Sequence, residues 1–305
     1  MTETAFAALI LILLGAVARH TGLVRQDQGD VFVRVVIYLA LPPLVFLIIV
    51  RADLDGALVL VPVAALVIHV ILVVVSWGSA RLVGMGRRST GALILATAVG
   101  NTGFFGLPLI YAAGEGFSLP AAVMYDALAT ALITWTSTVA IANHFGRADG
   151  AARVSLADVG RALLLPPTLA LALGLVVNLA GVDELPAFIE RPCEIMAAAV
   201  LPLTMLYGGL MLEVRGLARL WRQLSYVAVV RLGLAGLIGL GVAYVFRFEG
   251  EVLSTVVLFA VMPTAMMSLV LGVRGGVRSD VLAGAVAVTT VLCTLTLPLW
   301  RALLV

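Results

Sequence analysis

Two short segments of this chain combine glycine, proline and hydrogen-bonding side chains inside otherwise apolar sequence. They are GNTGFFGLP, residues 100–108, and VMPTAMMS, residues 261–268. Proline removes a backbone donor and glycine releases the helical constraint, so each segment predicts an interrupted helix. The half-helix after such an interruption begins with unpaired N–H groups and a partial positive charge, which suit an anion. We therefore expect the two segments to bind a negatively charged group.

A polar stripe that begins at Asp126 supplies further candidates. It continues at helical spacing with Thr130, Thr134, Ser137 and Thr138. One polar face therefore runs along an otherwise apolar helix. Asp126 lies roughly 10 Å from the helix end at ~1.5 Å per residue, at a depth where a carboxylate is costly and often titrates. It is a candidate for proton coupling or a counter-ion role; the alternative is a structural carboxylate hydrogen-bonded to a threonine or to Tyr125.

His69 is the other titratable candidate, because it lies in the middle of an apolar segment. It is a candidate proton relay, although a lone histidine also serves as a hydrogen-bonded interior residue. The sequence contains no GxSxG, HExxH or Gly-Lys-Ser/Thr motif. Cys193 and Cys293 lack the spacing of a disulfide framework or a metal site. We therefore expect no enzyme activity, no cofactor and no metal.

The elements that position these residues are predicted to be membrane-spanning helices. The chain has 305 residues, of which 62% are hydrophobic and 12% are charged, a composition far from that of soluble domains. The first apolar run is preceded by Glu3 instead of basic residues, so we interpret it as a retained helix, not a cleaved signal. Runs long enough to cross ~30 Å of hydrocarbon predict an all-α integral membrane fold of ten helices, at about residues 4–19, 31–50, 57–80, 89–112, 119–144, 161–181, 192–212, 225–246, 251–273 and 281–305.

Arginine placement predicts which side of the membrane each loop faces, since short cytoplasmic loops keep positive charge. The loops after the first, third, fifth, seventh and ninth helices hold thirteen arginines, and the opposite loops and termini hold four. Both termini are therefore expected on the extracytoplasmic side of the cell's inner membrane. Arg34 and Arg231 lie a turn or two inside helices two and eight, and we expect both to snorkel to the inner headgroups. Because the charge is confined to loops, no nucleic-acid partner is expected.

The two halves of the chain echo each other. Pro42 in the second helix aligns with Pro202 in the seventh, and Pro108 in the fourth aligns with Pro263 in the ninth. Since each half has five helices, the second half starts from the opposite side of the membrane, and the repeat is inverted. We predict a first repeat over residues 1–145, a short cytoplasmic linker over residues 146–160 and a second repeat over residues 161–305. Inverted repeats with interrupted helices at matching positions indicate a secondary transporter with a midplane site.

These motifs resemble those of a known family. GNTGFFGLPLIYAAG (100–114), YDALATALITWT (125–136), VMPTAMMSLVLGVRGG (261–276) and TLTLPLW (294–300) are similar to the bacterial branch of the auxin efflux carrier family. The resemblance covers the whole chain and implies a scaffold domain of helices one, two, six and seven. The other six helices would form a moving, elevator-type transport domain in which the broken helices four and nine cross at Pro108 and Pro263. The resemblance also suggests a homodimer.

The resemblance places Asn101 and Thr102 beside the carboxylate of a substrate and matches Tyr125 and Asp126 to a recurrent pair on helix five. Where relatives commonly have an asparagine after the second proline, this chain has Met267, which replaces an amide with a soft apolar surface. We therefore expect a more apolar ligand, such as an aromatic or branched monocarboxylate. The predicted substrate-binding residues are Asn101, Thr102, Gly103, Pro108, Pro263, Thr264, Met267 and Ser268.

The sequence thus predicts a secondary transporter that exports a small organic anion, a carboxylate, by alternating access driven by membrane potential or a proton gradient. Its expected partners are that anion, the lipid bilayer and a second copy of the chain. Two alternatives stay open at this point. One is a ligand-binding sensor or regulatory protein that uses the same fold without transport, and the other is a cation-coupled symporter of the bile acid transporter type.

Overall fold

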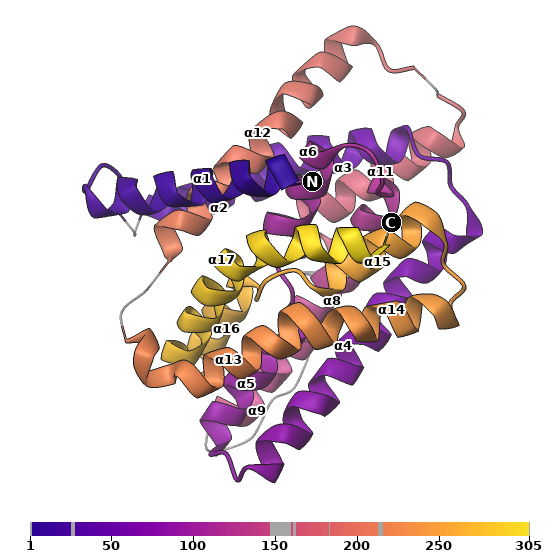
Figure 1. Cartoon of the computed structure of the whole chain (residues 1–305). Helices are drawn as coiled ribbons and strands as arrows, with labels where there is room; N and C mark the ends of the chain where they lie inside the picture. The colour runs from indigo at the N-terminus through magenta and orange to yellow at the C-terminus, as the bar shows by residue number, and fades with distance from the viewer. Residues whose placement is uncertain are drawn as a thin grey trace.

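The computed structural model describes residues 2–25, 28–146, 160, 163–182, 184–212 and 216–304, and these residues are mostly helical (Figure 1). Seven helical segments within these described ranges are long and apolar enough to cross a membrane, so the chain is a multi-pass membrane protein. Four of the seven are single helices, and the first three are α1 (Thr2–His20), α4 (Gly56–Leu82) and α12 (Ala187–Met211). A fourth single helix, α17 (Ser279–Leu304), ends the described chain.

The other three long segments contain π-helical turns, labelled η. The first joins α2 (Gly29–Val35), η2 (Val36–Ala40) and α3 (Leu41–Val50). The second joins α7 (Leu119–Met124), η4 (Tyr125–Thr130), α8 (Ala131–Ile133), η5 (Thr134–Thr138) and α9 (Val139–Gly146). The third joins a 3-10 turn, η6 (Leu217–Leu220), to α13 (Trp221–Val229), η7 (Val230–Leu234) and α14 (Ala235–Val245).

Shorter helices occupy the positions of the predicted fourth, sixth and ninth helices. The fourth consists of α5 (Arg87–Ala98), then η3 (Thr102–Gly106) continuing into α6 (Leu107–Ala113). The sixth is α11 (Pro166–Leu179), which begins at a proline as expected of a first helical turn. The ninth consists of α15 (Gly250–Ala260) and α16 (Met266–Gly275). The interruptions predicted from glycine and proline in the fourth and ninth helices are therefore confirmed.

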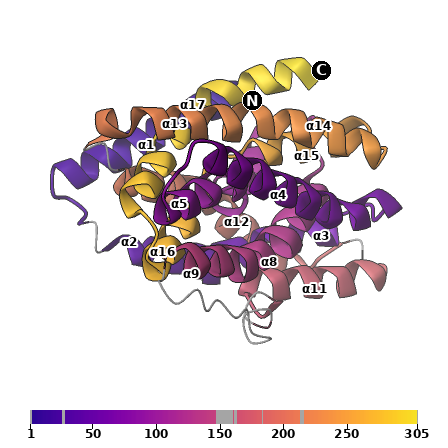
Figure 2. The same ribbon diagram turned by 90° about the horizontal axis from the view of Figure 1, so that it is seen from below.

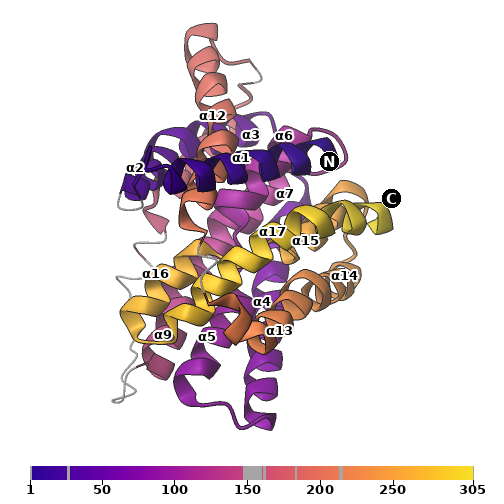
Figure 3. The ribbon, with the colours of Figure 1, turned by 60° about the vertical axis from the view of Figure 1, so that its left-hand side comes forward.

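The helices pack into two groups. In the first group α1 and α3 each pack on α12, and α11 packs on α3. These helices share the upper part of Figure 1, and α1, α3 and α12 share the upper part of Figure 3. In the second group, viewed in Figure 2, α4 and α5 lie between a layer that contains α13, α14 and α17 and a layer that contains α8 and α9. Contacts between the groups are sparser for each pair of elements and run from α12 to η3 and α6, from α3 to α7, from α1 to α6 and α17, and from α11 to η4.

The backbones of α1 and α12 approach closely within the first group. A Cβ atom placed on Gly15 would lie 2.2 Å from the carbonyl oxygen of Leu206, and one placed on Gly209 would lie 1.9 Å from that of Ile12. Small residues at such positions allow tight van der Waals packing between membrane helices. This contact makes the first group a close-packed unit against which the second group lies.

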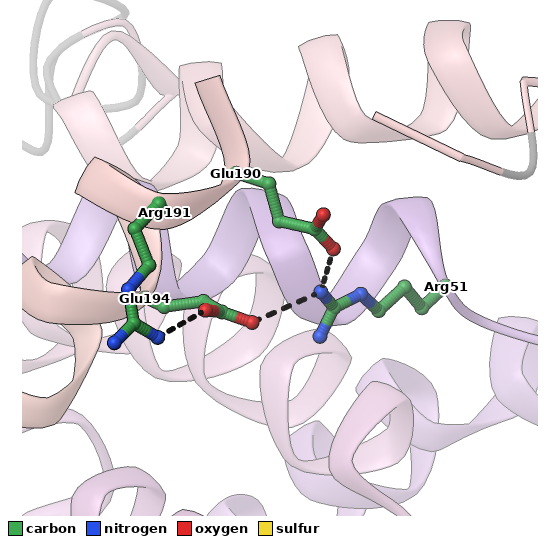
Figure 4. Close-up of polar contacts among 4 residues, drawn as sticks. All are labelled: Arg51, Glu190, Arg191 and Glu194. Carbon is green, nitrogen blue, oxygen red and sulfur yellow. Dashed lines mark hydrogen bonds and ion pairs between the residues drawn. The ribbon is translucent and has the colours of Figure 1, made fainter. Parts of the chain in front are cut away.

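An ion cluster joins the end of α3 to the start of α12 (Figure 4). The guanidinium of Arg51 contacts the carboxylates of Glu190 and Glu194, the latter at 3.3 Å, and Arg191 also lies 3.3 Å from Glu194. The hydrogen bond to Glu190 raises the pKa of Arg51 above its ordinary value. Because the Arg51 side chain is about half exposed, the surrounding water screens the cluster, and such pairs contribute ~0–1 kcal/mol.

The predicted linker, residues 146–160, falls almost entirely outside the described residues, which stop at Gly146 and resume with residue 160. The division into two five-helix repeats and the boundaries at 145 and 161 stay predictions. The free thiols of Cys193 and Cys293 lie on α12 and α17, the first partly buried and the second buried.

Candidate functional site

The two interrupted helices meet where their backbones are unwound. The N–H of Asn101 donates to the carbonyl of Pro263 at 2.7 Å, and the N–H of Ala265 donates to the carbonyl of Val99 at 2.9 Å. These bonds make a short antiparallel bridge between Gly100 and Thr264. Residues 99–101 and 261–265 thus satisfy part of each other's freed backbone, as buried non-helical segments must in a membrane protein. We call this region the crossover.

A cavity of about 120 Å³ lies beside the crossover, between the two helix groups. The first group contributes side chains from η2, α3 and the start of α11, and the second contributes residues 100–104 together with residues of η4, α8, η5 and the second unwound segment. The lining is mostly apolar, with Phe104, Trp135 and Met267 as large side chains and Asn101 and Asp126 as polar ones. Concave, mainly apolar sites with a few convergent polar groups are typical of small-molecule binding.

Asn101 lines this cavity and carries a buried side-chain donor that is not used by the described residues. Its side chain is buried, with 4% of the residue exposed, and its amide nitrogen Nδ2 has no hydrogen-bond partner among the described residues. A buried amide group that lacks a partner costs about 1–3 kcal/mol. A bound acceptor such as a carboxylate oxygen would remove that cost, so the predicted role of Asn101 is consistent with its place.

Asp126 and Thr102 form the polar wall next to Asn101. The hydroxyl of Thr102 donates to Asp126 Oδ1 at 2.6 Å and also lies 2.9 Å from the hydroxyl oxygen of Thr130. Gly103 makes this approach possible, because a Cβ atom on it would lie 2.8 Å from Asp126 Oδ2. The structure therefore brings together Asn101, Thr102 and Gly103 with the first residues of the stripe on helix five, and Asp126 bonds to a threonine of the fourth helix.

The opposite side of the crossover is closed by Arg231. This residue lies in η7 and is only 2% exposed. Its Nε donates to the carbonyl of Met262 at 2.6 Å and its Nη1 donates to the carbonyl of Thr97 at 3.0 Å. The prediction that Arg231 snorkels to the headgroups is wrong, because its guanidinium donates to backbone carbonyls at the ends of both α5 and α15. Arg34, in contrast, is exposed.

His69 also lies on the closed side. Its Nδ1 is 3.0 Å from the carbonyl of Ala98, and its Nε2 is 2.8 Å from the hydroxyl of Ser137. A carbonyl only accepts, so Nδ1 is the protonated nitrogen and Nε2 accepts from Ser137 in the neutral ring. His69 lines a second cavity of only about 20 Å³ together with Arg231 and Tyr125, and not the larger one. Nδ1 therefore pairs the end of α5, and Nε2 joins His69 to η5.

The remaining predicted residues separate into those at the cavity and those behind it. Met267 lines the cavity, as does Ala265. Thr264 is fully buried, and its hydroxyl donates to the carbonyl of Ala96 at 2.7 Å. Ser268 is fully buried with no partner for its hydroxyl among the described residues, and it does not line the cavity. Neither hydroxyl is placed to bind a ligand there.

The two prolines that the resemblance paired are not equivalent. Pro263 lies in the unwound segment, where its carbonyl accepts from Asn101. Pro108 lies in the first turn of α6, after η3 has already restarted the helix. Asn101 and its neighbours therefore mark the crossover in the fourth helix, because glycine and the π-helical restart move the break upstream of the proline.

Sequence reasoning missed several cavity residues. Trp135 and Phe104 supply aromatic surface, while Leu165, Pro167 and Thr168 come from the start of α11. The proline pair at residues 166–167 was a usable signal, because it fixes where α11 begins after the linker. The π-helical turns of helix five changed which residues face the cavity, and nothing in the helical spacing indicated them.

Comparison with known proteins identifies one protein family and two relatives, both of them named as transporters. Residues 1–301 match the family described as membrane transport protein. An uncharacterized transporter of Methanothermobacter thermautotrophicus is 32% identical over 306 residues, covering 99% of this chain and 98% of the relative. An uncharacterized transporter of Methanocaldococcus jannaschii is 23% identical over 307 residues, covering 98% of this chain and 97% of the relative.

Proposed function

Because this chain belongs to the membrane transport protein family, as its resemblance to the auxin efflux carriers predicts, we propose that it is a secondary transporter of a small organic anion that bears a carboxylate. One observation carries the proposal: the unpartnered amide of Asn101 lies at a cavity between two helix groups, at the ends of two half-helices. The site binds and releases its ligand without a chemical step, in keeping with a family of transporters.

Asn101 and the N-terminal ends of η3 and α16 hold the carboxylate in this proposal, since half-helix N-termini offer free N–H groups and partial positive charge. Thr102 and Gly103 shape the polar wall, and Met267 contacts the apolar part of the ligand. The cavity is small and mainly apolar, which favours an aromatic or branched carboxylate over a compact dicarboxylate.

Alternating access follows from the position of the cavity between the two groups. In our proposal the group containing α1, α3, α11 and α12 is the scaffold, and the group with the crossover shifts against it. The ten predicted spans then form an inverted repeat with both termini on the extracytoplasmic side of the inner membrane, and scaffolds of two chains form a homodimer. Sparse contacts between the groups support such a movement.

The energy source for transport depends on the net charge that crosses the membrane with the ligand. One negative charge that leaves a cell across 100 mV releases about 2.3 kcal/mol, so export of a net anion needs no coupled ion. Asp126 offers a second route, because a carboxyl group at the cavity can carry a proton across with the ligand.

Counterflow in proteoliposomes tests this function. Vesicles are loaded with one carboxylate from a set graded in size and polarity, and entry of the same labelled compound is followed. Saturable exchange is expected for an apolar member of the set. Binding without any exchange across the set would instead favour a sensor, and exchange that requires an added cation would favour a symporter.

A further inference from the structure

The crossover leaves four helix ends at one place, and each carries about half an elementary charge. The ends of α5 and α15 present carbonyls, and the starts of η3 and α16 present N–H groups. Arg231 donates to a carbonyl at each of the first two ends, Thr97 and Met262. One positive charge thus meets two partial negative charges, and the carbonyl side is electrically balanced by the protein itself.

The amide side already holds a negative group as well. The Asp126 carboxylate accepts from Thr102 at 2.6 Å and packs on Gly103, the first two residues of η3. The partial positive charge at that helix start therefore has its counter-ion in the protein. A ligand whose only charged group is a carboxylate would lie beside the carboxylate of Asp126, and two negative charges in one small cavity repel each other.

The cavity still offers an unfilled place for a carboxylate. Asn101 Nδ2 is unpartnered in a residue that is 4% exposed, and Ala265 and Met267, at the start of α16, line the same cavity. Among the described residues that line it there is no arginine or histidine. The cavity therefore combines a carboxylate-binding corner with a fixed carboxylate and no cationic side chain.

We propose that the substrate is the zwitterion of an α-amino acid with an apolar side chain. Its carboxylate binds Asn101 and the start of α16, and its ammonium group binds Asp126. The two corners are adjacent, because Asp126 bonds to the residue that follows Asn101 in the chain. An α-amino acid carries its two charges on neighbouring carbons, which matches this adjacency.

The apolar side chain has matching surface in the same cavity. Ile37 and Leu41 line it from the first group, and Phe104, Trp135 and Met267 line it from the second. This inference rests on the proposed transport function and replaces its net anion by a solute that has a carboxylate but no net charge, so apolar monocarboxylates without an ammonium group are no longer expected to be exchanged. It makes the ammonium group the feature that distinguishes a substrate from a non-substrate.

The test compares leucine with 4-methylpentanoate, which has the same carbon chain and carboxylate but no ammonium group. Counterflow of each labelled compound is measured in proteoliposomes with the wild type, with Asp126→Asn and with Asp53→Asn, an exposed aspartate outside the cavity. We expect the wild type and Asp53→Asn to exchange leucine and not 4-methylpentanoate. Asp126→Asn should lower leucine exchange about tenfold or more, since a buried ion-pair partner is lost, and Asp126→Glu should restore part of it.

The outcomes test the zwitterionic substrate and the carrier function separately. Exchange of 4-methylpentanoate but not leucine by the wild type would overturn the zwitterion and leave the carrier function in place. Unchanged leucine exchange in a folded Asp126→Asn protein would overturn the role of Asp126. If the wild type exchanges no compound among apolar amino acids and graded carboxylates, both the zwitterion and the carrier function are wrong.

Discussion

The two sides of the crossover differ in whether the protein itself supplies hydrogen-bond partners for their polar groups. On the carbonyl side, Arg231 and His69 bond to the last residues of α5 and, for Arg231, to Met262 after α15, and the residual cavity is about 20 Å³. On the amide side, Asn101 keeps a free donor and the cavity is about 120 Å³. The same broken backbone is thus closed by protein groups on one side and left open to a ligand on the other.

This difference shows how a membrane protein keeps unwound helices without losing stability. Freed backbone groups are costly in hydrocarbon unless they are paired, and the closed side supplies that pairing within the chain. The open side carries a side-chain donor that has no partner among the described residues, and in our proposal this donor binds the solute. Substitutions on the closed side should change stability, whereas those on the open side should change binding.

The largest stability loss is expected for Arg231→Met. Removing the guanidinium leaves the carbonyls of Thr97 and Met262 buried without their donor, at ~1–3 kcal/mol for each acceptor. Unfolding in detergent micelles, followed by heat or denaturant, should show a loss of about 2–6 kcal/mol. Arg34→Met, at an exposed arginine, is the matched control and should unfold near the wild type. Equal behaviour of the two variants would show that the closed side does not depend on Arg231.

A smaller loss is expected for Gly100→Ala. A Cβ atom on Gly100 would lie 2.1 Å from Arg231 Nη2, so the guanidinium must shift away from the carbonyls. Overpacking of this kind costs about 1–3 kcal/mol. The control is Gly78→Ala on α4, where nothing lies within 4 Å of the added carbon. A Gly100→Ala protein as stable as the Gly78→Ala protein would contradict the close packing of Arg231 on the crossover.

The smallest effect is expected for Arg51→Ala, the arginine of the exposed ion cluster. Like Arg231, Arg51 contacts acceptor atoms, here the carboxylates of Glu190 and Glu194. Its side chain is about half exposed, so water can hydrogen-bond to these carboxylates when the guanidinium is removed. A loss of ~0–1 kcal/mol is expected, decreasing as salt is added. The unfolding midpoint measured at low and high salt checks this. A loss as large as that of Arg231→Met would show that burial is not what distinguishes the two arginines.

Composition and proline placement were sufficient to predict the membrane-spanning class and the broken fourth and ninth helices. Asn101 and Thr102 could be predicted as site residues because polar side chains beside glycine in an apolar helix cost free energy unless they are hydrogen-bonded or bind a ligand. Arg231 was misplaced because depth along a helix does not reveal which neighbouring backbone groups need a donor. Thr264 and Ser268 are predicted to bind substrate but do not line the cavity, because residue order gives no information on the side to which the unwound segment and the start of α16 turn.

The sequence also could not predict which residues of the C-terminal half of helix five face the cavity. Helical spacing puts Asp126, Thr130 and Thr134 on one face, and all three do line the cavity. The π-helical turns η4 and η5 then rotate the following residues, so that Ser137 reaches His69 on the closed side. Trp135 lines the cavity for the same reason, although it lies off the predicted stripe.

The central claim is that the open side of the crossover is the ligand site and that Asn101 is its donor. The most direct measurement is unfolding and counterflow of Asn101→Ala in parallel, with Asn143→Ala on α9 as the control. We predict that Asn101→Ala unfolds no earlier than the wild type, because the lost Nδ2 donor had no partner among the described residues, and that its exchange is abolished while Asn143→Ala exchanges normally. Exchange with wild-type affinity in Asn101→Ala, or a fall in stability as large as that of Arg231→Met, would contradict the claim.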